Sequence, residues 1–212
     1  MLRSATLLAF CCLLLRAQEP PRPGPPPPAA PRPDRPPLLD DGLLDPAWFG
    51  TNVPFTQTEA VDYFWSRPGL NLRGHTLFLQ PWEAPAPLQS DRNAGDQARS
   101  VEMTNRFPGI LWGALSGLLY GKVKVSHTEG DLALVGRFVD VGAGSKRVQW
   151  LQLFGSGESA TWDLKIVDLH TGELLLAAHH RTYTRGVKDT LPDRLQAWSG
   201  SFATLLAARA AR

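Results

Sequence analysis

The sequence predicts an α/β (α+β) domain built on one mixed β-sheet of about five strands, with two helices packed on one face. Three observations carry this prediction. Short apolar or alternating runs recur between residues 75 and 184, helical periods occupy 96–120 and 190–209, and turn residues separate the segments. The resulting order, β-α-β-β-β-β-α, suits a sheet whose two helices cover the same face.

The first strand and the first helix come at the start of the domain. The run "HTLFLQPW" (75–82) is short, apolar and bounded by turn residues, which is typical of a buried strand. From Asp96 to Tyr120 the pattern becomes helical, and Pro108 predicts a kink there or the start of a new helix. The apolar residues expected on one helix face are Val101, Phe107, Leu111, Leu115 and Leu118.

Four strands follow the first helix. "GKVKVSH" (121–127) alternates valine with lysine and predicts a half-exposed strand, whereas "LALVGRFVDV" (132–141) is apolar enough to be buried on both sides. "ATWDLKIVDL" (160–169) alternates again, and "ELLLAAHHRTYT" (173–184) is its hairpin partner across the turn "HTG". In the strand at 160–169, Trp162, Leu164 and Ile166 are expected on one face. The residues expected on the other face are Thr161, Asp163 and Lys165.

The last helix has the clearest boundaries. Thr190 and Asp193 have the spacing of a capping box, and Pro192 fits the first turn. The apolar stripe of this amphipathic helix, which ends near Arg209, consists of Leu195, Trp198, Phe202 and Leu205.

The N-terminal residues 1–17 have the layout of a secretory signal peptide. A basic start at Arg3 precedes the apolar run 5–15, and Ala17 is the expected cleavage site. The run is shorter than the roughly 20 residues that a membrane-spanning helix needs. Removal of Arg3 and Arg16 with the leader lowers the formal charge from +2 to zero, so the whole-chain charge predicts no nucleic-acid partner.

Both cysteines, Cys11 and Cys12, lie inside this leader. Lipidation of either cysteine is an alternative to cleavage at Ala17 and would tether the protein to a membrane. Against lipidation, Phe10 occupies a position where the processing enzyme requires a small residue. Without the leader the chain can form no disulfide and no thiolate metal site, and an exported protein of this kind fits a bacterial envelope or periplasm.

A proline-rich linker is predicted over residues 18–37, which hold eleven of the nineteen prolines. Such a segment favours extended polyproline II and buries no core, which predicts a disordered linker. The alternatives are a tether that holds the domain away from a membrane and a ligand for a proline-binding module. Residues 38–59 are expected to form an irregular arm, and 60–212 a single globular domain. The arm residues expected to pack on the domain are Trp48, Phe49 and Phe55.

The glycine-rich stretch "VDVGAGSKRVQW" (139–150) raises the question of phosphate binding. A P-loop requires a Gly-Lys step before a helix, but here Lys146 follows a serine and residues 148–154 do not begin a helix. The dinucleotide fingerprint also fails, because Arg147 stands where the third glycine is needed. We therefore predict no cofactor.

Catalytic and metal sites are not expected either. The nucleophile elbow Gly-x-Ser-x-Gly is missing. Adjacent His179 and His180 on a strand point to opposite faces, so they cannot chelate one ion. A carboxylate pair drawn from Asp140, Asp168 and Glu158 could support hydrolysis, although nothing in the sequence brings these residues together.

One possible partner contact remains in the glycine-rich stretch. Trp162 and Trp198 fit the apolar periodicity of their strand and helix, which predicts that they lie in the core. Trp150 lies between two glycine-rich turns and fits no such periodicity. Tryptophan is favoured at interaction hot spots. Together with Lys146 and Arg147, Trp150 is the predicted contact surface.

Residues 72–184 resemble an uncharacterised bacterial envelope family. The shared pattern has a strand ending in Val-x-Asp, a Gly-Ser-x-x-x-Arg turn, a Phe-Gly-x-Gly segment and a Val-Asp-x-x-Thr-Gly-Glu turn, and "LRGHTLFLQPWE" resembles the family's first strand. The matching residues here are Val139, Asp140, Gly144, Ser145, Arg147, 154–157 and 167–173. The chain departs from the family in the early position of Arg147 and in lacking a good lipidation cysteine. The resemblance implies an exported α/β domain, in many members a lipoprotein, with no assigned activity.

The sequence therefore predicts an exported, non-catalytic binding or assembly accessory protein of the periplasm or cell envelope. Its partner would be an envelope protein, a lipid or a polymer. Two alternatives stay open at this stage: a carboxylate-based hydrolase, and a structural subunit of an envelope assembly.

Overall fold

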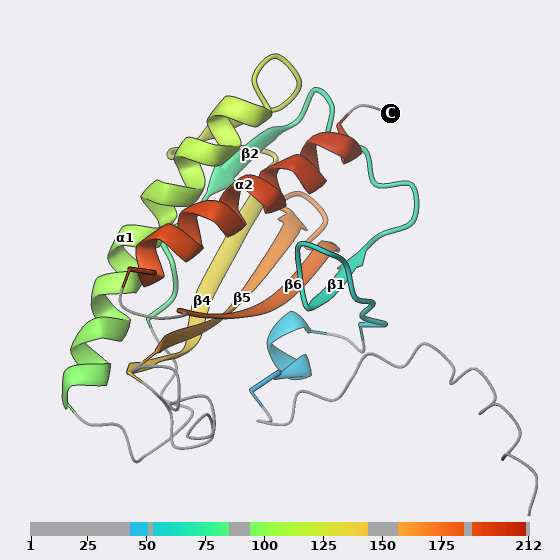
Figure 1. Cartoon of the computed structure of the whole chain (residues 1–212). Helices are drawn as coiled ribbons and strands as arrows, with labels where there is room; N and C mark the ends of the chain where they lie inside the picture. Colours follow the sequence, from blue (N-terminus) through green and yellow to red (C-terminus); the bar gives the residue numbers. More distant parts are fainter. Residues whose placement is uncertain (1–42, 51–52, 85–93, 144–156, 185–187, 211–212) are drawn as a thin grey trace, which may run out of the picture. The chain divides into compact units, whose positions relative to one another are not determined.

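A six-stranded mixed β-sheet with two long helices on one face makes up most of the described structure (Figure 1). The structure is a computed structural model. It describes residues 43–50, 53–84, 94–143, 157–184 and 188–210. The elements, in chain order, are η1 (Pro46–Phe49), β1 (Tyr63–Ser66), β2 (Thr76–Leu79), α1 (Ala94–Leu118), β3 (Lys124–Ser126), β4 (Leu132–Ala143), β5 (Glu158–Asp168), β6 (Leu174–Tyr183) and α2 (Leu191–Arg209).

The strands are arranged in the order β1-β6-β5-β4-β2-β3. β4, β5, β6 and β1 pair antiparallel in succession, and β2 pairs parallel with both β4 and β3. The long crossover from β2 to β3 and the short step back to β4 explain why β2 lies between two strands that follow it in sequence. The predicted mixed sheet with two helices is thereby confirmed.

One strand was not predicted from the sequence. β1 adds a sixth strand at the sheet edge, where Tyr63 lies opposite His179 and Ser66 opposite Leu176. The strand has only four residues, and both Tyr63 and Phe64 are buried, so no alternation reveals it. Its position is determined by pairing with β6, which is a tertiary effect.

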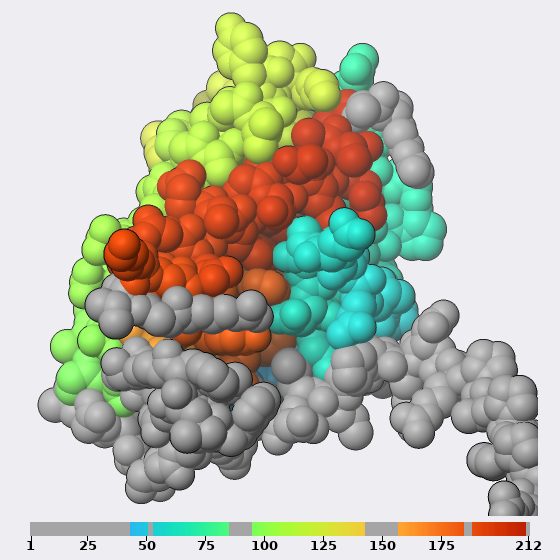
Figure 2. Space-filling model, in the orientation of Figure 1, coloured from blue at the N-terminus to red at the C-terminus, as the bar shows by residue number. Residues whose placement is uncertain are grey.

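The helices bury the inner face of the sheet under a cluster of aromatic rings. Trp162 and Phe107 are fully buried, and their ring centroids lie 5.4 Å apart. Trp198 of α2 contacts Trp162 edge-to-face at 4.9 Å, so both helices reach the same strand. Figure 2 shows the two helices packed against each other along this face, with the segment around β1 beside α2. The alternation predicted for 160–169 is confirmed, because Trp162, Leu164 and Ile166 are all inward and buried.

The buried row of α1 differs at its ends from the predicted one. Phe107, Leu111 and Leu115 are buried as expected, but Val101 and Leu118 are 49% and 47% exposed. Val101 lies six residues before Phe107, a rotation of about 120° away from it around the helix, so it falls off the buried face. At the other end, Leu119 takes the inward position in place of Leu118. The row that the structure buries is Met103, Phe107, Leu111, Leu115 and Leu119. The helix also continues through Pro108, so no new helix begins there.

α2 follows its predicted boundaries. The Thr190 hydroxyl accepts a hydrogen bond from the N–H of Asp193 at 3.3 Å and donates one to its carboxylate at 2.6 Å. Leu195, Trp198 and Phe202 are buried. Neither α1 nor α2, the long helices of the described chain, combines the length and apolarity that crossing a bilayer requires.

The arm packs on the outer face of the sheet, opposite the helices. Phe49 and Phe55 are buried there in an edge-to-face chain that continues to Tyr63 on β1. Trp48 is half-buried beside them. The sheet is therefore covered on both faces, by helices on one and by the arm on the other.

Gly136 on β4 is a point of close approach that can be tested. A Cβ at this position would lie 2.5 Å from the Trp82 indole and 2.9 Å from Leu164. Gly136→Ala is therefore expected to lower the free energy of unfolding by about 1–3 kcal/mol through overpacking, measured by urea denaturation. On the same strand, a Cβ on Gly142 meets nothing closer than 3.7 Å, and Gly142→Ala should change the free energy of unfolding by less than about 1 kcal/mol. Equal losses in the two variants would contradict this packing.

Candidate functional site

The predicted partner contacts Lys146, Arg147 and Trp150 lie outside the described residues. The proposal that they meet a partner stays a prediction. The candidate sites that can be built from the structure lie elsewhere, on the outer face of the sheet and at the C-terminal end of α1.

The three carboxylates considered for hydrolysis are not brought together. Asp140 lies opposite Thr161, and Asp168 is seven residues further along β5, roughly 23 Å away at the rise of a strand. The backbone N–H groups of Thr171 and His170 donate to Asp168 and hold its pKa below the ordinary value, so this residue caps a turn, as its position before "HTG" suggests. Glu158, at the other end of β5, pairs with Arg99 at 3.3 Å.

The two adjacent histidines point to opposite faces, as expected. His179 faces outward to Asp163, and His180 faces inward and stacks on the Trp198 ring at 5.6 Å. The His180 imidazole lies 3.0 Å from the Asp62 carboxylate. Burial by itself would raise the pKa of Asp62. The hydrogen bond and the charge of His180 have the larger effect, and the pKa of Asp62 is lowered. Among the described residues no cluster of three or more histidine, cysteine or acidic side chains could hold a metal ion.

A buried charge cluster lies on the outer face of the sheet. The Asp163 carboxylate is fully buried in β5, where it accepts from Arg137 Nε of β4 at 2.9 Å and lies 2.6 Å from His179 Nδ1 of β6. Three neighbouring strands thus each supply one member. Because an unpaired buried carboxylate is costly, the two partners are what allow Asp163 to be there. We call Arg137, Asp163 and His179 the outer-face cluster.

The arm closes over the outer-face cluster through Trp48. The Trp48 ring lies between two cations, with the Arg137 guanidinium 4.6 Å and the Lys165 ammonium 4.1 Å from its centroid. Lys165 also donates to the Trp48 carbonyl at 2.7 Å, and Trp48 Nε1 donates to Glu83 at 2.9 Å. Burial lowers the pKa of Lys165 below its usual range. Arg137 further pairs with Asp45 at 3.2 Å, so the cluster binds the arm at two points.

The chemistry of the outer-face cluster is that of an anchor. A buried His–Asp pair is one component of a hydrolytic triad, but a nucleophile must also be within hydrogen-bond reach of the imidazole. The other nitrogen of His179, Nε2, is buried and has no hydrogen-bond partner in the described structure. With the arm in place the pair is sealed from solvent, and its contacts all hold strands or the arm together.

An open pocket of about 550 Å³ lies where α1 ends and β3 begins. Gly121, with φ of +73°, turns the chain out of α1 in a left-handed conformation that favours glycine. Backbone hydrogen bonds from Gly74 N–H to the Lys122 carbonyl and from Lys124 N–H to the His75 carbonyl then join this turn to the start of β2. We call this the tip pocket; its lining residues are His75, Trp112, Ser116, Tyr120, Lys122 and Lys124, with Gly74, Gly121, Val123 and Val125.

The walls of the tip pocket are aromatic, and its rim is cationic. Trp112 stacks on His127 at 3.7 Å, which fixes the indole against the wall. Tyr120 is 87% exposed, and Lys122 and Lys124 project from the turn and from the edge strand β3. The Ser116 hydroxyl is buried and has no hydrogen-bond partner within the described part of the chain.

His75 at the pocket rim pairs with Asp131. The Asp131 carboxylate also accepts a hydrogen bond from the Thr76 N–H at 2.6 Å. Burial by itself would raise the pKa of Asp131. The hydrogen bonds from His75 and Thr76 have the larger effect, and the pKa of Asp131 is lowered. No hydrogen bond joins His75 to Ser116 among the described residues, and the Ser116 oxygen is inaccessible. His75 and Ser116 therefore do not form a hydrogen-bonded base–nucleophile pair in the described structure.

Sequence reasoning missed both of these sites for the same reason. Asp163 looked like an ordinary outward-facing residue of an alternating strand, because the arm that covers it has no readable period. The tip pocket draws its lining from two segments that are distant in sequence, 74–75 and 112–125. The one available signal was the exposed "LYGKVK" turn, where an aromatic residue and two lysines follow a helix.

The sequence matches no family model and no curated protein. Among solved structures it is similar to a variant of PelC from Paraburkholderia phytofirmans, a dodecamer, with a TM-score of 0.44 and 11% identity over 70% of this chain and 96% of that one. Protein XCC0632 from Xanthomonas campestris, of family DUF330, has a TM-score of 0.44 and 11% identity over 68% and 91%. A lipoprotein from Neisseria meningitidis has a TM-score of 0.39 and 11% identity over 63% and 98%. At these values we draw neither family nor function from them.

The outer-face cluster can be tested by removing its central charge. Asp163→Asn removes the buried counter-charge of Arg137 and leaves it the partly exposed Asp45. Breaking a buried pair in this way costs about 3–5 kcal/mol. The variant should therefore unfold at a much lower urea concentration than the wild type. Asp168→Asn, at the half-exposed end of the same strand, is the control and should move the midpoint far less. Similar midpoints for the two variants would show that Asp163 is not the anchor.

Proposed function

We propose that the protein is an exported, non-catalytic binding or assembly accessory protein of a bacterial envelope, and that its partner engages the tip pocket. The observation that carries this proposal is the pocket itself. It is open, holds about 550 Å³, and has aromatic walls and a cationic rim without a nucleophile beside a base. Pockets of roughly 300–1,000 Å³ with few polar groups are typical of ligand sites.

Two histidine–carboxylate pairs bear on the choice between binding and catalysis. The His179–Asp163 pair is sealed under Trp48 and serves the anchoring of the arm. The His75–Asp131 pair is accessible, but Ser116, the serine of the pocket lining, has a buried oxygen. Asp168 lies a strand's length from Asp140 and Glu158, so it does not form a carboxylate pair with either of them. These arrangements support a role in binding.

Export is supported by the N-terminal sequence. Residues 1–17 have the basic, apolar and small-residue order of a signal peptide, and 18–37 form a proline-rich spacer before the arm. The arm is fastened to the domain through Trp48 and Asp45, so any tension or tether on the linker is transmitted to the outer face of the sheet. The tip pocket, on the β2–β3 side, stays available for a partner.

Site-specific photo-crosslinking in intact bacterial cells tests the proposal. Tyr120, 87% exposed at the pocket, is replaced by a photoreactive phenylalanine derivative; Tyr183, 38% exposed at the end of β6, receives the same replacement as a control. Illumination should give a discrete adduct from position 120 and little or none from position 183, with the protein recovered from the envelope fraction.

Two outcomes would contradict the proposed function. Equal adducts from the two positions, or none from position 120, would remove the tip pocket as the contact. Recovery of the protein only from the cytoplasmic fraction would remove export. A structural-subunit role would give self-crosslinks of twice the chain mass from position 120, which gel mobility distinguishes from adducts with a different partner.

A further inference from the structure

We propose that the tip pocket docks on the headgroup layer of an anionic phospholipid membrane. This inference deepens the proposed function by naming the partner class of the same site, and it rests on that function. Formal charge for the chain without its leader is zero, so attraction to an anionic surface has to come from a local patch of charge rather than from the whole protein.

Such a patch exists at the tip. Arg73, Lys122 and Lys124 lie on two segments that are held together by the Gly74–Lys122 and Lys124–His75 backbone hydrogen bonds. In the described structure no ion pair joins any of these three cations to a carboxylate. In the described structure the Arg73 side chain donates from Nε to the carbonyl of Ala210 at 3.2 Å. Among the described residues, no ion pair therefore neutralises the three positive charges of the patch.

Most other cations of the described chain are used internally. Arg67 pairs with Glu173, Arg99 with Glu158, Arg106 with Glu102, Arg137 with Asp163 and Arg194 with Asp189. Lys165 is held by the Trp48 ring and carbonyl. Against this background, the cations at the tip are unusual in being both unpaired and adjacent, which is the arrangement that an anionic surface recognises.

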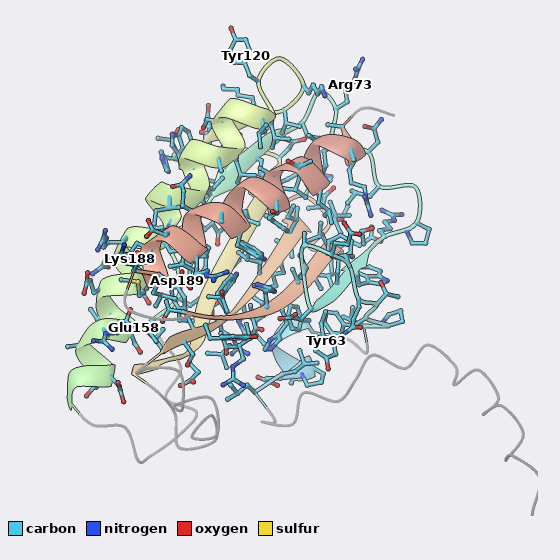
Figure 3. The ribbon with its side chains drawn as sticks, viewed as in Figure 1. Tyr63, Arg73, Tyr120, Glu158, Lys188 and Asp189 are labelled. Carbon is cyan, nitrogen blue, oxygen red and sulfur yellow. The ribbon has the colours of Figure 1, made fainter. Side chains whose placement is uncertain are left out.

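Apolar groups accompany these charges at the tip. Tyr120 is 87% exposed and Leu118 is 47% exposed, in the last turn of α1 and directly after it. Figure 3 shows Tyr120 projecting away from the body of the protein, at the same end as Arg73. Tyrosine favours the membrane–water interface, and cations around an exposed apolar side chain are typical of proteins that lie on lipid.

The tip pocket supplies a place for the headgroup. Lys122, Lys124 and His75 are donors on its rim, and the fixed Trp112 ring lines the wall behind them. A phosphate at the rim would be held by charge, and Tyr120 and Leu118 would enter the layer around it. The cationic rim is the one feature of the described pocket that selects an anionic ligand.

Addition of a peptide strand to the sheet fits the tip less well. β3 is the free edge, but it has only three residues, and lysine on a short edge strand is a device that opposes strand addition. Stacking of nucleic-acid bases needs several exposed aromatic rings along a cationic groove, whereas Tyr120 is the one strongly exposed ring among the described pocket residues. The membrane surface makes use of all three cations and both apolar side chains.

Vesicle sedimentation of the mature protein, purified after export, tests the inference. The protein is mixed with vesicles of phosphatidylcholine alone or with added phosphatidylglycerol. We expect binding to rise with phosphatidylglycerol and to fall as salt is raised, because screening shortens the range of the attraction. Each lysine near an anionic surface contributes about fivefold in affinity, so Lys122→Ala with Lys124→Ala should weaken binding roughly 25-fold.

A matched control is available away from the tip. Lys188 is exposed and has no carboxylate partner in the described structure, and Figure 3 shows it beside Asp189, well separated from Tyr120 and Arg73. Lys188→Ala should leave vesicle binding within twofold of wild type, whereas Tyr120→Ser should weaken it several-fold. All variants are compared for unchanged circular dichroism and thermal unfolding.

Three results would overturn the inference. The first is equal binding to vesicles with and without phosphatidylglycerol, and the second is an equal effect of the Lys122/Lys124 and Lys188 substitutions. The third is competition by soluble glycerol phosphate, which would assign the site to a free anion. If vesicle binding fails while position 120 still crosslinks to an envelope protein, the lipid assignment falls and the proposed binding function stands.

Discussion

The buried carboxylate of Asp163 is the group around which the outer half of this structure is organised. A charge in that position is tolerated only if counter-charges and donors reach it, and they come from Arg137 on β4 and His179 on β6. The pairing fixes the registers of three strands against one another. With the register fixed, alternate residues of β5 point to the other face, where Trp162 fills the space between the helices and the sheet. The polar contacts on the outer face and the apolar packing on the inner face therefore require the same strand register.

The same cluster explains why the arm is ordered on the sheet. The Arg137 guanidinium also lies 4.6 Å from the centroid of the Trp48 ring and pairs with Asp45 at 3.2 Å. The charges on this side of the molecule are thus paired within the fold. On the β2–β3 side the situation is reversed, because no ion pair within the described residues joins Lys122 or Lys124 to a carboxylate. The charges of the outer face are paired, whereas the described lysines of the tip are not. This contrast is the physical basis for placing the binding function at the tip.

The sequence contained the repeating elements of the fold but not the contacts between distant segments. Strands with clear alternation, such as the one around Trp162, and the capped helix after Thr190 could be predicted because the information is local. β1 could not, since its four residues become a strand only by pairing with β6. The burial of Asp163 was also invisible, because it depends on an arm more than one hundred residues earlier in the chain. The tip pocket requires two distant segments, 74–75 and 112–125, to meet, and only the lysines of the 121–127 strand hinted at it.

The central claim is that this domain works by surface contact through its tip. Hydrogen–deuterium exchange of the mature protein, with and without isolated envelope membranes, tests that claim most directly. The account predicts that backbone amides around residues 73–76 and 116–125 become protected when membranes are present, and that amides near Trp48 and Lys188 do not change. Protection confined to other regions of the described chain, or none around 116–125, would contradict it.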